Sequence, residues 1–289
     1  MLRGYFAIIT AMLIWGSVGV FARWAGTEPL ITVTYRVLLA GIALGVLSLV
    51  TRRPAGAKPG ARVSPWLLGL SGVALALNWL FFFKGLATTS VSNTVLSYYT
   101  APVWVALAAP ALLGERLERR TIVATAIAFA GICIMLYQPG QTLSANDLLG
   151  IGYGLAAALF YATVTITGRR LAAVPAPRLV LVQCWVAAAI LLPAVLLTKG
   201  PGALAASPGA LGLLAVVGVV HTALALILYF WGMRGVKVQH VGVLSYLDPV
   251  SAVLFAFIFL KEVPSGASLA GGALVLLGSA VLMSKPKQA

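Results

Sequence analysis

The sequence predicts an all-α integral membrane protein with ten transmembrane helices, arranged as two five-helix repeats of opposite orientation. The first observation is composition: 61% of the 289 residues are hydrophobic, 9% are charged, and the mean hydropathy is +1.02. A soluble protein carries about 25% charged residues, so lipid must surround this chain. The second observation is a series of ten apolar runs, and the third is a long internal repeat.

Each apolar run is long enough to cross a membrane, which takes about 20 residues of helix. Pro, Gly and short polar stretches between the runs favour loops. The expected spans are 4–24, 30–51, 66–86, 91–113, 121–138, 147–168, 178–198, 209–233, 240–260 and 266–284. The first run is too long for the apolar core of a signal peptide, so we expect a retained helix.

The repeat is found by shifting the sequence by 147 positions without a gap. Matched pairs are then Phe83 with Phe230, Tyr99 with Tyr246, Pro102 with Pro249, Glu115 with Glu262 and Gly131 with Gly278. A shift of 146 matches Arg23 with Arg169 and Pro29 with Pro175. We therefore expect two repeats, at residues 1–140 and 141–289. Because five helices is an odd number, the second repeat enters the membrane from the other side, an architecture of many secondary transporters.

Lysine and arginine predict the orientation, because they concentrate in cytoplasmic loops. With a cytoplasmic N-terminus, the inside segments hold Arg3, Arg52, Arg53, Lys58, Arg62, Arg116, Arg119, Arg120, Arg169, Arg170, Arg178, Arg234, Lys237, Lys285 and Lys287. The outside segments hold only Arg23, Lys84, Lys199 and Lys261. Both termini are therefore expected in the cytoplasm.

The remaining composition excludes several classes of function. The net charge of +14 lies in clusters between apolar runs, so it indicates topology rather than a nucleic-acid partner. Cys133 and Cys184 show neither metal-ligand spacing nor a disulfide framework. His221 and His240 have no carboxylate at catalytic spacing, and no phosphate-binding glycine loop is present. We expect no enzyme, no cofactor, no metal and no obligate protein partner.

These features together resemble the drug/metabolite transporter superfamily, EamA family. The resemblance rests on ten helices, the five-plus-five repeat, and Pro102 and Pro249, each followed thirteen residues later by a glutamate. The Trp15-Gly16-Ser17 step also fits. The polar and aromatic third and fourth helices are similar to the YddG-type amino-acid exporters, although Ala101 stands where a tryptophan often precedes the proline. The resemblance implies a bacterial inner-membrane exporter whose central cavity is lined by helices 1, 3, 4, 6, 8 and 9, with helices 5 and 10 at the back.

Helices 5 and 10 also carry small residues four positions apart, which allow close helix contact. These pairs are Ala124 with Ala128, Ala126 with Ala130, Gly266 with Ala270, and Ala267 with Gly271. We interpret these two helices as scaffold.

Two matched tyrosines are the first candidates for the substrate site. Tyr99 lies nine residues from the outer end of its helix, roughly 13 Å deep at about 1.5 Å per residue. Tyr246 is equally deep from the inside. Aromatic belts lie at membrane interfaces, so a substrate platform is our preferred interpretation and core packing the alternative. Tyr98 lies about 100° round the helix from Tyr99 and is a further candidate.

The other substrate candidates also come in matched pairs or faces. Asn78 lies on a helix face that the repeat maps onto the face of His221. Trp15 and Tyr161 match at a shift of 146, both about eleven residues into their helices. We expect these four to line the cavity; interhelical hydrogen bonds or packing are the alternatives.

Five residues are candidates for coupling or gating. Asp248 is the one carboxylate inside an expected helix, and an intramembrane acid is functional by default. Glu115 and Glu262 lie at helix ends, where they end a helix or gate. Pro102 and Pro249 each remove a backbone donor, so the carbonyl of Tyr98 or Ser245 would face a cavity, unless the prolines only kink the helices for packing.

Arg36 is expected to snorkel or to meet Glu28, which leaves no basic side chain at the midplane. We therefore expect a small-molecule transporter in the lipid bilayer, exporting amino acids or similar metabolites without obligatory ion coupling. The alternatives are a proton-coupled drug or metabolite antiporter, a carrier of larger anions such as nucleotide sugars, and a lipid-modifying membrane enzyme.

Overall fold

The computed structural model describes residues 2–51, 64–137 and 143–284 of the chain. All of its regular structure there is helical. The elements are α1 (Leu2–Ala25), α2 (Pro29–Val50), α3 (Pro65–Thr88), α4 (Val91–Tyr98), α5 (Ala101–Leu113), α6 (Arg119–Met135), α7 (Ala145–Arg170), α8 (Ala176–Lys199), the 3-10 helix η1 (Pro201–Leu204), α9 (Pro208–Gly218), the π-helix η2 (Val219–Leu224), α10 (Ala225–Met233), α11 (Val238–Leu244), α12 (Leu247–Phe255), the π-helix η3 (Ala256–Leu260) and α13 (Gly266–Met283).

In the described residues these elements form ten long helical segments, the number that the sequence predicts. In the described residues, nine are long and apolar enough to count as candidate spans, and α6 is the shorter tenth. Three of these segments consist of more than one helix: α4 with α5, α9 with η2 and α10, and α11 with α12 and η3. The predicted boundary at residues 140 and 141 lies outside the described residues, as do Arg52, Arg53, Lys58, Arg62, Lys285 and Lys287.

Serines and glycines set the ends of the helices. The side chains of Ser64, Ser90, Ser144, Ser207 and Ser265 each accept a hydrogen bond from a backbone N–H in the first turn that follows, which satisfies a donor that the helix itself leaves free. Gly114 ends α5 in the left-handed region, at φ 68°. Its repeat partner Lys261 ends η3 in the same conformation, at φ 59°, so the repeat extends to backbone geometry.

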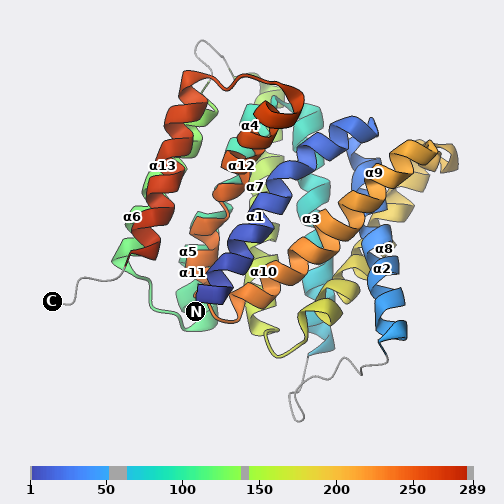
Figure 1. The fold of residues 1–289 in the computed structure, drawn as a ribbon, viewed down its shortest axis with the longest axis horizontal. Helices are drawn as coiled ribbons and strands as arrows, with labels where there is room; N and C mark the ends of the chain where they lie inside the picture. The colour runs from blue at the N-terminus through green and yellow to red at the C-terminus, as the bar shows by residue number, and fades with distance from the viewer. Residues whose placement is uncertain (1, 52–63, 138–142, 285–289) are drawn as a thin grey trace.

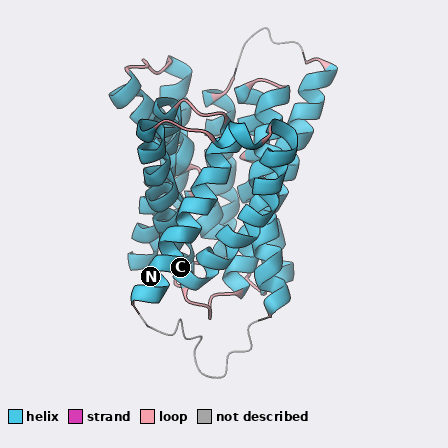
Figure 2. Ribbon diagram, turned by 90° about the vertical axis from the view of Figure 1, so that its right-hand side faces the viewer, coloured by secondary structure: helices cyan, strands magenta, loops and turns pink. Residues whose placement is uncertain are grey.

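The helices run between two opposite ends of the bundle (Figure 2). We call the end where α1 begins and α13 finishes the N-terminal face, and the end where α1 finishes and α13 begins the opposite face (Figure 1). Pairs of helices pack across the repeats: α3 with α7, α1 with α10, and α2 with α8.

The two scaffold helices, α6 and α13, lie side by side at one edge (Figure 1). A Cβ on Gly271 would lie 2.3 Å from the Gly131 carbonyl oxygen, so the two backbones nearly touch. Ala124 and Ala128 are fully buried in this contact. Ala126, Ala130, Gly266 and Ala270 are exposed instead, so only one of the two predicted small-residue faces on each helix is used for packing.

Candidate functional site

Two of the ten helical segments are interrupted at mid-depth, and the candidate site lies at these interruptions. The segment of α4 and α5 is interrupted at Tyr99 and Thr100, and the segment of α11 and α12 at Ser245 and Tyr246. Pro102 lies in the first turn of α5, where its missing N–H costs nothing. The prolines therefore start new helices rather than bend continuous ones.

At these breaks the two repeats meet through a polar contact. The Tyr99 hydroxyl donates to Asp248 Oδ2 at 3.0 Å. Asp248 lies in the first turn of α12, where the positive end of the helix dipole stabilises a carboxylate. The Ser245 carbonyl, which the sequence suggested would be free, instead accepts the Asp248 N–H at 3.2 Å.

A continuous series of aromatic rings crosses the centre of the bundle. Tyr98 contacts Tyr99 and Tyr161 with ring centroids 5.5 and 5.9 Å apart. Tyr161 reaches Tyr229 at 6.4 Å, and Tyr229 reaches Trp15 at 5.3 Å. Both repeats contribute, and Tyr98, Tyr161 and Trp15 are only partly buried. Such rings offer faces for an apolar or cationic ligand.

The π-helix η2 lies beside the Trp15 end of this series of rings. A π-helix displaces backbone carbonyls from the regular pattern and is frequent at functional sites. The His221 carbonyl accepts from Trp15 Nε1 at 2.9 Å and from Arg36 Nη2 at 3.2 Å. The His221 ring is buried, with Nε2 2.9 Å from Ser17 Oγ and Nδ1 3.4 Å from the Val216 carbonyl. His221 thus fastens α1 and α2 to the second repeat.

Arg36 corrects the expectation that its side chain would snorkel to the membrane surface or meet Glu28. It is buried, donates from Nε to Thr222 Oγ1 at 2.8 Å, and lies 4.4 Å from the centre of the Trp79 ring. Glu28 does not meet it, because Glu28 pairs with Lys199 at 2.8 Å. Arg36 neither snorkels nor binds a carboxylate in the described structure.

Two other predicted site residues are deeply buried. Asn78 donates from Nδ2 to the Ala157 carbonyl at 2.8 Å, joining α3 to α7, and is a polar neighbour of Tyr98. Tyr246 is fully buried behind Tyr99, with ring centroids 6.2 Å apart. Among the described residues its hydroxyl has no hydrogen-bond partner. In this conformation, both lie behind the partly exposed rings.

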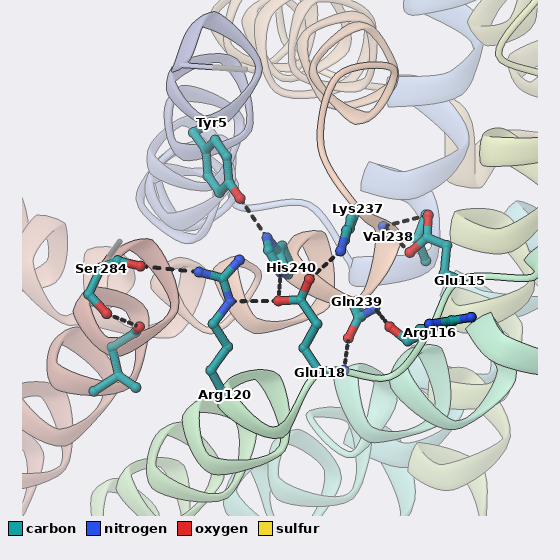
Figure 3. A network of polar contacts seen from close by, with 11 residues as sticks. Tyr5, Glu115, Arg116, Glu118, Arg120, Lys237, Val238, Gln239, His240 and Ser284 are labelled. Atoms are coloured by element: carbon teal, nitrogen blue, oxygen red, sulfur yellow. Dashed lines mark hydrogen bonds and ion pairs between the residues drawn. The ribbon is translucent and has the colours of Figure 1, made fainter. Parts of the chain in front are cut away.

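The gating candidate Glu115 joins the two repeats at the N-terminal face (Figure 3). Its carboxylate accepts the Val238 N–H at 3.0 Å, at the start of α11, and lies 3.6 Å from Arg169 Nε. Beside it, Gln239 donates to the Arg116 carbonyl at 2.8 Å and accepts the Glu118 N–H at 3.1 Å. The loop between α5 and α6 is thus tied to α11 by backbone and side-chain bonds.

Glu118 is the centre of the same network (Figure 3). It binds Lys237, Arg120 Nε at 2.6 Å and His240 Nε2 at 3.2 Å. His240 Nδ1 lies 2.5 Å from the Tyr5 hydroxyl, which brings in α1. Partial burial alone raises the pKa of Glu118, but the hydrogen bonds from Lys237, Arg120 and His240 lower it to about 2. The carboxylate is therefore charged at neutral pH. It joins the start of α6 to Lys237 and α11, and through His240 to α1.

At the opposite face the described residues form a different set of contacts between the repeats, in which Asp147 accepts hydrogen bonds from Thr89 Oγ1 and Asn93 Nδ2. Glu262, the repeat partner of Glu115, pairs with Arg23, the partner of Arg169, on the exposed surface. Val238 is fully buried, whereas its repeat partner Val91 is 64% exposed. The two faces are therefore not equivalent, because the start of α11 is enclosed by the other repeat and the start of α4 is exposed.

Sequence reasoning missed Arg36, Glu118 and Tyr229 as residues of the site and its closure. The repeat carried a signal for Tyr229, because a shift of 147 places it on Phe82, which contacts Tyr98 with centroids 4.8 Å apart. No sequence pattern links Glu118 to His240, which is 122 positions away. Within the described ranges no group of three metal-ligating side chains occurs.

Comparison with known proteins gives a consistent result. The model of the EamA-like transporter family matches residues 2–137 and 148–284. An uncharacterized transporter of Archaeoglobus fulgidus is 31% identical over 276 residues, covering 95% of this chain and 94% of that protein. The aromatic amino acid exporter YddG of Ancylobacter novellus is 26% identical, covering 94% of each chain.

A probable terminal-alkyne amino-acid exporter of Streptantibioticus cattleyicolor is also 26% identical, covering 92% of this chain and 91% of that protein. A solved crystal structure superposes with a TM-score of 0.83 at 24% identity over 97% of this chain and 96% of that one. At this identity the superposition supports the fold alone.

Proposed function

Because this chain belongs to the EamA-like transporter family, whose members are membrane transporters and not enzymes, we propose that it exports amino acids, with aromatic and other neutral ones favoured, or similar small metabolites. Transport proceeds by rocking of the two repeats around a central site. Two relatives named as amino-acid exporters support the substrate class.

The observation that carries the proposal is the aromatic series from Tyr98 to Trp15, built by both repeats at mid-depth beside Asp248. Each ring has at least one polar neighbour, so the site combines apolar faces with a few fixed polar groups, the usual composition of a small-molecule site. The substrate residues of the proposal are Trp15, Asn78, Tyr98, Tyr99, Tyr161, His221 and Tyr246, joined by Tyr229.

The orientation completes the proposal. With the N-terminal face in the cytoplasm of a bacterial cell, the Glu115 and Glu118 network closes the cytoplasmic side. Glu115, Glu262, Pro102 and Pro249 then act as gating residues, since they lie where the halves meet or where helices break.

The experiment is uptake of a panel of labelled amino acids into proteoliposomes containing the purified protein. We expect saturable uptake of phenylalanine or another neutral amino acid above the level of empty liposomes. Absence of uptake and of counterflow for every amino acid in the panel would refute the proposed substrate class.

A second candidate, transport of small organic anions, is favoured by one observation: the buried guanidinium of Arg36. A buried basic group in a membrane protein often marks an ion pathway. The same liposomes, supplied with labelled dicarboxylates and nucleotide sugars, test it directly. Uptake of these anions without uptake of amino acids would favour the second candidate.

A further inference from the structure

Asp248 differs from the other acidic residues of the chain. Glu28 pairs with Lys199, Glu115 with Arg169, Glu118 with Arg120 and Lys237, and Glu262 with Arg23, while Asp147 accepts bonds from Ser144, Thr89 and Asn93. Within residues 2–51, 64–137 and 143–284, the Asp248 side chain accepts one hydrogen bond, from Tyr99, and forms no ion pair. It is the acid at mid-depth that lacks a cationic partner in the protein.

An unpaired carboxylate at this depth is costly, because neither lipid nor a protein cation replaces its hydration. The residue is nevertheless not sealed off, since Asp248 and the neighbouring residues 247–250 are partly exposed. The hydrogen bond from Tyr99 and the dipole of α12 offset only part of the cost. A cation that binds during the transport cycle and is then released would supply the positive charge that Asp248 lacks.

We propose that Asp248 binds the ammonium group of the substrate and that it determines specificity for amino acids with a free amine. The assignment rests on the function proposed above. The substrate side chain then lies along Tyr98 and Tyr161, whose partly exposed rings continue from the Tyr99 contact. Ring faces and a carboxylate both attract an ammonium group.

The charge of the whole site narrows the substrate class further. The Arg36 guanidinium is directed to Thr222, the His221 carbonyl and the Trp79 ring, and within the described residues it forms no ion pair with Asp248. One acid and one base kept apart match a substrate with one charge of each sign. A zwitterionic α-amino acid fits this arrangement better than an amine or a carboxylate alone.

The test compares three ligands of one shape on the purified full-length protein, by tryptophan fluorescence and by competition with labelled phenylalanine in proteoliposomes. Phenylalanine carries both charges, N-acetylphenylalanine lacks the ammonium and phenethylamine lacks the carboxylate. We expect phenylalanine to bind most tightly and N-acetylphenylalanine about tenfold to a hundredfold more weakly, the range for a hydrogen bond to a charged group. Asp248→Asn should weaken phenylalanine to the level of N-acetylphenylalanine, whereas Asp248→Glu should restore part of the preference.

Glu28→Gln is the matched control, because it removes an acid from the exposed pair with Lys199, and it should keep the wild-type ligand order. Melting temperature verifies that each variant is folded. Equal binding of phenylalanine and N-acetylphenylalanine by the wild type, or wild-type affinity in folded Asp248→Asn, would overturn the assignment. Failure to bind any amine-bearing ligand would overturn it as well. Lack of uptake despite tight, amine-dependent binding would refute the proposed export and leave the assignment standing.

Discussion

Trp15 shows how a single residue links the two repeats at the site. Its indole nitrogen donates to the His221 carbonyl at 2.9 Å, and its ring contacts Tyr229. The adjacent Gly16 allows α1 to approach α12, since a Cβ there would lie 2.0 Å from Ser251 Oγ and 2.9 Å from the Asp248 carbonyl oxygen. The Trp15-Gly16-Ser17 step thus combines a partly buried ring, a close helix contact and a hydrogen bond to the His221 ring.

Alanine at Trp15, Tyr99 or Asn78 should reduce transport roughly tenfold or more, the usual effect of removing a central binding contact. Trp15→Ala and Tyr99→Ala remove ring faces, and Asn78→Ala removes the bond that fixes α3 to α7 beside Tyr98. Initial uptake rates, normalised to the amount of protein in the liposomes, measure the effect. Trp66→Ala is the control, because Trp66 is 76% exposed at the start of α3. Normal kinetics in all three site variants would refute the assignment.

Depth and repetition in the sequence were enough to select most of the residues that meet at the centre. They identified Tyr98, Tyr99 and Asp248, which the structure brings into one contact series. The buried position of Arg36 was not predicted, because a single residue in a helix does not indicate which face it occupies. Nor does it indicate whether a neighbouring helix offers hydrogen-bond acceptors. Both acceptors, the Thr222 hydroxyl and the His221 carbonyl, lie in η2, which the sequence did not predict.

Glu118 gives a prediction with a defined dependence on pH. Its folded-state pKa of about 2 lies below the usual value of 4.5, so its charge stabilises the folded protein fully above pH 4.5 and progressively less as pH falls toward 2. Glu118→Gln should therefore lower the melting temperature by a nearly constant amount between pH 5 and 8, by about 2–4 °C for each kcal/mol lost. The difference from wild type should shrink below pH 4.5. A difference that vanished between pH 5 and 8 would contradict the assigned network.

At the scale of elements, the contact between α6 and α13 depends on glycine. Gly131 and Gly271 face each other, and a Cβ on either would lie within 2.5 Å of the other's carbonyl oxygen. Since backbone atoms cannot rotate away, such a side chain must push the helices apart. Small residues four apart predicted close helix contact for these two scaffold helices, but the sequence could not tell which of two small-residue faces would be buried.

Gly271→Ala should destabilise the protein by about 1–3 kcal/mol, the usual cost of overpacking. The matched control is Gly45→Ala in α2, where an added Cβ would meet no atom within 4 Å. Thermal unfolding in one detergent compares the two variants with wild type. Equal melting temperatures for all three proteins would show that the helices do not pack at this distance.

The sequence did not predict how the helical segments are interrupted at mid-depth. Pro102 and Pro249 favour a bend, a packing kink or the start of a new helix, and all three leave the same sequence signal. The structure selects the third, with α5 and α12 starting at mid-depth. The π-helices η2 and η3 carry no proline or glycine at all, so local sequence gives no reason to expect them.

At the scale of the whole molecule, the orientation in the membrane is the first prediction. The described basic residues of the predicted inside segments, such as Arg120, Arg169 and Lys237, lie at the N-terminal face, where they bind the loop between α5 and α6 and the end of α10. Reporter fusions at Gly235 should therefore be cytoplasmic and at Gly202 periplasmic. Fusions at Gly56 and Gly140, which lie outside the described residues, should be cytoplasmic and periplasmic respectively. A cytoplasmic signal at Gly140 would contradict the inverted repeat.

Energy coupling is the second whole-molecule prediction. In the proposed transport cycle the two repeats rock around the central site. Asp248 and His221 are the titratable carboxylate and imidazole at mid-depth in the described residues. They lie on separate helices, and His221 is held by Ser17 and the Val216 carbonyl, so the described part of the chain shows no relay of acids between the two faces. A substrate zwitterion brings its own ammonium to Asp248 and needs no proton. Counterflow of labelled amino acid should accordingly proceed in proteoliposomes at equal pH on both sides. If an imposed pH gradient instead drives net accumulation, and Asp248→Asn or His221→Ala abolishes accumulation while counterflow persists, transport is proton-coupled and that residue is the coupling site.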